Sequence, residues 1–143
     1  MRVRWGTLTL VLVLGLAACG SQTPSSQRYL SVPINRTLHP GIAMKALLTG
    51  RLAGRADTQH RQACLWIADG AGRTVLLWPS GYVAENDPLR ILNRSRKVVG
   101  TVGHQVSLGG GSAVVSSGTA GLQACGPPTP TDGWIVAPTT PGG

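Results

Sequence analysis

RQACLWIADGAGRTVLLW, residues 61–78, contains two runs of β-forming residues around the Gly-rich turn Asp69–Gly72. This pattern predicts an antiparallel hairpin. A four-residue turn sets three cross-strand pairs: Ala68 with Arg73, Trp66 with Val75, and Cys64 with Leu77. Because apolar residues occupy both faces of the two runs, we expect the hairpin to lie buried in the middle of the domain.

Short segments with strand character lie on both sides of this hairpin. They are Lys45–Ala53, Leu89–Leu92, Lys97–Val102, Gln105–Leu108 and Trp134–Val136. The first has an alternative, a helical turn that leads into a strand, and the run Gly109–Gly111 predicts a flexible loop. With 20 Gly, 10 Pro and no long helical pattern, the chain is expected to be mainly β, either a small sandwich or an OB-like β-barrel.

The N-terminus has the pattern of a secretory signal peptide. Arg2 and Arg4 precede Thr7–Leu16, a charge-free apolar run that is shorter than the roughly 20 residues of a membrane-spanning helix. A basic start, a short apolar run and small residues before a cleavage point are typical of export signals. We therefore expect the mature protein to lie outside the cytoplasm.

The apolar run ends in Leu16-Ala17-Ala18-Cys19. This sequence resembles the lipobox of bacterial lipoproteins, in which Leu and two small residues precede a cysteine. The resemblance implies removal of residues 1–18, attachment of acyl chains to the thiol of Cys19, and a lipid anchor in the cell membrane or outer membrane. The alternative is an ordinary signal peptide followed by a chance cysteine.

The chain is thus expected to have four regions. They are the signal peptide, residues 1–18; the lipidated cysteine with a flexible tether, 19–40; a small β-barrel domain, 41–137; and a disordered tail, 138–143. Polar residues with interspersed proline favour the tether, and a Pro- and Gly-rich end favours the tail.

Two cysteines remain when Cys19 is assigned to the lipid. Cys64 and Cys125 are an even pair in an oxidising compartment, which favours a disulfide. The alternative makes Cys64 the nucleophile of a thiol or redox enzyme, with His60 or His104 as its base. Against it, Cys64 lies in the apolar run Ala63–Ala68, and burial makes a thiol unreactive.

Basic residues outnumber acidic ones. The chain has 13 Lys and Arg against 5 Asp and Glu, a formal charge of +8; loss of Arg2 and Arg4 leaves 11 basic residues and a charge of +6. Such a surface favours anionic neighbours. One candidate anion-binding group surrounds a predicted turn and consists of Arg90, Arg94, Arg96 and Lys97. A second group lies near the first hairpin and consists of Arg51, Arg55 and Arg61.

Because the protein is expected outside the cytoplasm, anionic lipids or envelope polymers are more natural ligands than nucleic acid. Trp78 and Tyr82 lie near the first group in sequence and could supply a stacking surface. The alternative is that the arginines keep a β-rich surface soluble and protect strand edges.

Groups for acid–base or metal chemistry are few. Of the five carboxylates only Glu85 and Asp87 are neighbours, and a solvated loop explains them. The three histidines are scattered: His39, His60 and His104. We therefore predict no catalytic residue, no metal site and no cofactor.

Three short motifs follow one another in the mature domain: Cys64-Leu65-Trp66, Trp78-Pro79-Ser80-Gly81-Tyr82 and Gly109–Gly111. Their order resembles small, uncharacterised exported bacterial domains whose strands curl as in an OB-like barrel. The resemblance covers Cys64 to Gly111 and implies a fold but no activity. The sequence thus predicts a membrane-tethered lipoprotein, either a non-enzymatic module with an envelope protein as partner, a binder of anionic polymers or lipids, or a thiol enzyme.

Overall fold

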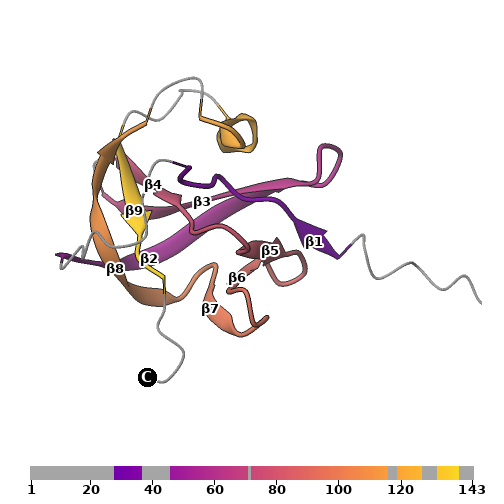
Figure 1. Cartoon of the computed structure of the whole chain (residues 1–143), viewed down its shortest axis with the longest axis horizontal. Coiled ribbons are helices and arrows are strands. Elements are labelled where there is room, and N and C mark those ends of the chain that lie inside the picture. Colours follow the sequence, from indigo (N-terminus) through magenta and orange to yellow (C-terminus); the bar gives the residue numbers. More distant parts are fainter. Residues whose placement is uncertain (1–27, 37–45, 71, 116–118, 127–131, 139–143) are drawn as a thin grey trace, which may run out of the picture.

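A computed structural model describes residues 28–36, 46–70, 72–115, 119–126 and 132–138 of the chain. These residues form β-strands and one short 3-10 helix (Figure 1). The elements are β1 Tyr29–Leu30, β2 Ala46–Asp57, β3 Gln62–Asp69, β4 Gly72–Leu77, β5 Val83–Glu85, β6 Arg90–Leu92, β7 Val98–Thr101, β8 Gln105–Val114, η2 Leu122–Cys125 and β9 Asp132–Val136.

Five strands close into a barrel in the order β2-β3-β4-β9-β8. The barrel closes because β2 is long enough to pair with two neighbours: Ala46–Arg51 pairs with β8, and Arg51–Asp57 pairs with β3. All neighbours are antiparallel except β4 and β9, which run parallel. The predicted mainly β fold with a small barrel is therefore confirmed.

The hairpin of β3 and β4 has much of the predicted register. Trp66 pairs with Val75 and Ala68 with Arg73, and a further pair, Asp69 with Gly72, makes the turn shorter than expected. The predicted pair of Cys64 with Leu77 is wrong. The ladder between the two strands ends at Trp66 and Val75, while Cys64 continues to pair with Arg55 of β2 and Leu77 with Ile135 of β9.

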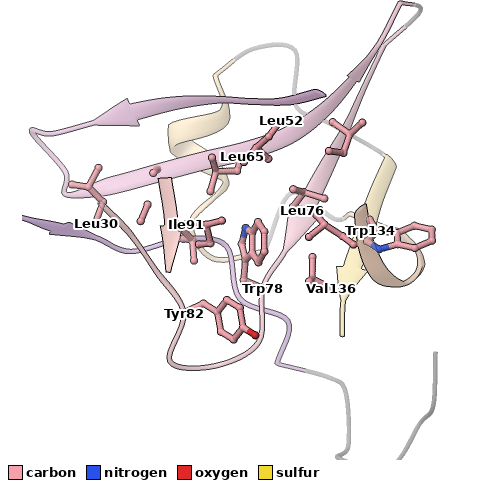
Figure 2. Close-up of a cluster of buried hydrophobic side chains, with 14 residues drawn as sticks. Leu30, Leu52, Leu65, Leu76, Trp78, Tyr82, Ile91, Trp134 and Val136 are labelled. Atoms are coloured by element: carbon pink, nitrogen blue, oxygen red, sulfur yellow. The ribbon is translucent and has the colours of Figure 1, made fainter. Parts of the chain in front are cut away.

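Both faces of this hairpin are buried, as predicted. Leu65 and Leu76 belong to the main core, and Cys64 and Val75 to a smaller cluster on the opposite face, under η2. Trp78 lies in the middle of the main core, with Leu76 on one side and Ile91 on the other (Figure 2). The hairpin is thus the shared wall of two apolar clusters.

A second sheet, β1-β5-β6-β7, packs its buried residues into the same main core. Its first strand falls in the region predicted as tether. Leu30, Val32 and Pro33 are buried, and Ser31 and Ile34 bridge to β3 and to the end of β4. Part of the predicted tether therefore belongs to the domain, because Leu30 and Val32 are in the main core.

The glycine run Gly109–Gly111 is not a loop but part of β8. A Cβ atom on Gly110 would lie 1.9 Å from the carbonyl oxygen of Ile135 and 2.5 Å from the indole nitrogen of Trp134. Glycine at this position lets β8 and β9 approach closely. The run therefore serves close strand packing rather than flexibility.

The remaining predicted strands exist with small shifts of their ends, as β6, β7 and β9. The first predicted strand exists as β2, which is extended without a break from Ala46; residues 41–45, where the alternative helical turn would begin, lie outside the described residues. Residues 1–27, with the predicted signal peptide and Cys19, lie outside the described residues, as do 139–143 of the predicted tail.

Candidate functional site

The predicted basic group divides between a strand and a turn. Arg90 begins β6, whereas Arg94, Arg96 and Lys97 lie in the turn between β6 and β7 and are exposed. We call residues Arg94–Lys97 the basic turn. It is the part of the predicted anion-binding group that faces solvent.

Asn93 fixes the shape of the basic turn. Its side-chain Oδ1 accepts hydrogen bonds from the backbone N–H groups of Ser95 at 2.9 Å and Lys97 at 3.0 Å. Arg96 has a left-handed backbone conformation, with a φ of +62°. Its N–H donates a hydrogen bond to the carbonyl oxygen of Asn93. These hydrogen bonds therefore set the backbone from which the basic side chains extend.

Two arginines of the basic turn also hold neighbouring segments. Arg94 Nε donates to the carbonyl oxygen of Ser80 at 2.8 Å. The guanidinium of Arg96 lies over the ring of Tyr29, 4.5 Å from its centroid, a cation–π contact. The basic turn is thereby joined to the first strand of the domain.

Arg90 belongs to a different arrangement. Its guanidinium pairs with the carboxylate of Glu85, which also pairs with Arg28. Glu85 is only 3% exposed, so the interpretation of Glu85 and Asp87 as a solvated loop is wrong for Glu85. Sequence reasoning missed this triad because Arg28 falls in the predicted tether and Glu85 follows a turn-rich stretch. The segment Val83-Ala84-Glu85 is too short and has no alternation that would mark it as a strand.

The expected aromatic stacking surface is absent from the described part of this region. Trp78 and Tyr82 stack on each other, with ring centroids 5.9 Å apart, and both are buried in the main core. Their rings fill the interior because both have large apolar surfaces that burial stabilises. The prediction that they would stack on a ligand is wrong.

The second arginine group lies on the barrel. Arg51 and Arg55 are exposed on β2, and Arg61 ends the connection between β2 and β3 at φ +55°. The carbonyl oxygen of Arg61 accepts hydrogen bonds from the backbone N–H and the hydroxyl of Ser31. These residues are therefore on another sheet from the basic turn.

Cys64 and Cys125 form the predicted disulfide, with their Cα atoms 4.9 Å apart. Both side chains are buried. Arg73 adds a second connection to the same helix: its Nη1 donates to the carbonyl oxygen of Cys125 and its Nη2 to that of Gly126. Because its sulfur is bonded and buried, Cys64 is poorly placed to act as a nucleophile.

His60 pairs with an acid rather than with Cys64. Its backbone N–H donates to Asp57 Oδ1 at 3.0 Å, and its Nδ1 lies 2.7 Å from Asp57 Oδ2. These hydrogen bonds, the backbone one first, lower the pKa of Asp57 from its usual 3.8. The pair joins the end of β2 to the turn that leads into β3.

The described residues include no group of three or more His, Cys, Asp or Glu that could hold a metal ion. In that same part of the chain, no helix has the length and apolar character needed to cross a membrane. Comparison of the chain with protein-family models, with curated proteins and with solved structures finds no match.

Proposed function

We propose that this protein is an exported lipoprotein, anchored by acyl chains on Cys19, whose small barrel is a non-enzymatic binding or structural module of the cell envelope. The observation that carries the proposal is the sequence Leu16-Ala17-Ala18-Cys19 directly after a short apolar run. The cysteine pairing supports it: since Cys64 and Cys125 are bonded to each other, Cys19 is the cysteine left for modification.

The chemistry of the described side chains supports a non-enzymatic role. Cys64 is bonded, Glu85 is buried between two arginines, and Asp57 is paired with His60. Catalytic acids, bases and nucleophiles need access to a substrate. The groups best suited to catalysis are here engaged in holding strands and turns together.

Mass spectrometry of the protein purified from bacterial membranes tests the anchor. We expect an N-terminal peptide that begins at Cys19 and carries diacylglycerol, and incorporation of radiolabelled palmitate. Cys19→Ala should abolish the incorporation, whereas the double variant Cys64→Ala, Cys125→Ala should retain it. Retention of Met1, or an unmodified Cys19, would overturn the proposal.

Crosslinking in the intact envelope tests the module. A lipid-anchored module with a protein partner should give one reproducible crosslinked species that is lost in Cys19→Ala, which frees the domain from the membrane. Turnover of a substrate by the purified protein would contradict the non-enzymatic role.

A further inference from the structure

The start of the domain and the basic turn lie against each other. Tyr29 belongs to β1, the first described strand, and the guanidinium of Arg96 covers its ring at 4.5 Å. Arg28, the residue before β1, has a 60% exposed side chain that pairs with Glu85. The chain therefore enters the domain at a point where the basic turn is in contact.

The length of chain before this point limits its distance from Cys19. Nine residues, Cys19–Gln27, precede Arg28, and a fully extended chain of nine residues spans at most about 32 Å. A lipid on Cys19 would hold this end of the domain near the bilayer. Helix η2 lies on the other side of the barrel from β7 (Figure 1), the strand that follows the basic turn.

The exposed charges near β1 are basic and would attract an anionic surface. Arg94, Arg96 and Lys97 are all exposed, and the carboxylate of Glu85 is already paired with Arg28 and Arg90. Asp87, which is exposed, precedes β6, whereas the basic turn follows it. The acidic side chain and the basic turn are thus at opposite ends of a strand.

We propose that the basic turn binds the anionic phospholipid headgroups of the membrane in which the acyl chains are anchored. This inference rests on the proposed lipid anchor. Guanidinium and ammonium groups donate hydrogen bonds to phosphate oxygens, and basic residues beside an acyl anchor add attraction to an anionic bilayer. The contact orients the domain with β1 and the basic turn toward the lipid and η2 away from it.

The orientation is measurable on the lipidated protein in vesicles. A fluorophore on Ser95→Cys reports on the basic turn, and one on Gln123→Cys reports on η2; both residues are exposed. The quencher is a phospholipid labelled on its headgroup. We expect several-fold stronger quenching at residue 95 in phosphatidylcholine–phosphatidylglycerol vesicles than in pure phosphatidylcholine, reversal by high salt, and no such difference at residue 123.

Charge variants separate the turn from the overall charge. The variant Arg96→Gln, Lys97→Gln should reduce quenching at residue 95 to its level on neutral vesicles. The control Arg51→Gln, Arg55→Gln removes the same charge from the barrel and should leave quenching unchanged. Because Arg96 also contacts Tyr29, Lys97→Gln alone is the third variant, expected to lose about half of the lipid-dependent quenching.

Each failure has its own signature. Equal quenching of the two labels, or equal quenching on anionic and neutral vesicles, would overturn the headgroup contact even if the protein floats with the vesicles. Binding of soluble anionic polysaccharide by the turn without lipid-dependent quenching would overturn it in favour of a polymer site. Failure to float with neutral vesicles would instead overturn the lipid anchor.

Discussion

Arg73 and Cys125 are joined by a hydrogen bond from the guanidinium Nη1 to the carbonyl oxygen, 2.7 Å long. The sulfur of the same cysteine is bonded to Cys64. Helix η2 is therefore held to the β3–β4 hairpin through both the backbone and the side chain of one residue. This arrangement covers the hairpin face opposite the main core.

Removal of the disulfide should destabilise the domain strongly. The bond joins residues 61 positions apart, and closing such a loop disfavours the unfolded chain by roughly 4 kcal/mol. The double variant Cys64→Ala, Cys125→Ala should lose about that free energy of unfolding in urea denaturation. The unaltered protein under reducing conditions is its control and should fall by a comparable amount; a loss below about 1 kcal/mol would contradict the prediction.

Arg73 should contribute to stability through the carbonyl groups it binds. Arg73→Met removes two charge-assisted hydrogen bonds, and we expect a loss of about 2 kcal/mol in the free energy of unfolding. Arg73→Lys keeps the charge without the two-pronged geometry and should recover only part of it. If lysine restores full stability, the charge rather than the paired hydrogen bonds is what matters.

Glu85 should be necessary for docking β1. Glu85→Gln leaves the half-buried Arg90 without its carboxylate partner, and breaking a buried ion pair in this way costs about 3 kcal/mol. Hydrogen exchange should show faster exchange at Leu30, whose strand pairs with β5. The matched variant Asp87→Asn changes an exposed turn acid and should alter stability by less than about 0.5 kcal/mol.

The glycines of β8 offer a sharp pair of variants. Gly110→Ala places a Cβ atom 1.9 Å from a backbone oxygen of β9, whereas the nearest atom to a Cβ on Gly109 is 3.9 Å away. We expect Gly110→Ala to lose about 3 kcal/mol or to fail to fold. Gly109→Ala should stay within about 0.5 kcal/mol. Thermal unfolding of both variants is the measurement, and equal effects would contradict the close approach.

The pH dependence of Asp57 has a defined sign. Its pKa is lowered in the folded protein by the hydrogen bonds from His60, so its contribution to stability is present above the unfolded pKa and is lost as pH falls through the folded value. A carbon NMR titration should find the Asp57 carboxyl titrating below 3.8. Asp57→Ala should remove this contribution, and a midpoint at or above 3.8 would contradict the effect of His60.

Local patterns predicted much of the barrel. The Gly-rich turn Asp69–Gly72 was enough to place Trp66 opposite Val75, and the count of cysteines was enough to pair Cys64 with Cys125. Both depend on neighbours in the sequence or on simple arithmetic. The parallel pairing of β4 with β9 depends on strands far apart in the chain, and no local pattern specifies it.

The candidate site was predicted less well for the same reason. The sequence grouped Arg90 with the basic turn, but the strand that carries Arg90 directs it to Glu85. The role of Tyr29 was missed because two extended residues after a polar stretch give too short a pattern to identify a strand. Its contact with Arg96 joins segments more than sixty positions apart.

The short first strand has a mechanical consequence. Tension applied through residue 28 is carried first by β1, which has two residues and pairs with β5, and by the ion pair of Arg28 with Glu85. The next supports are the single bridges of Ser31 and Ile34. Because these bridges run to Gln62 of β3 and to Trp78 after β4, pulling from this end would detach residues 28–34 first from the second sheet and then from the barrel, one contact at a time, before the long ladders between barrel strands separate.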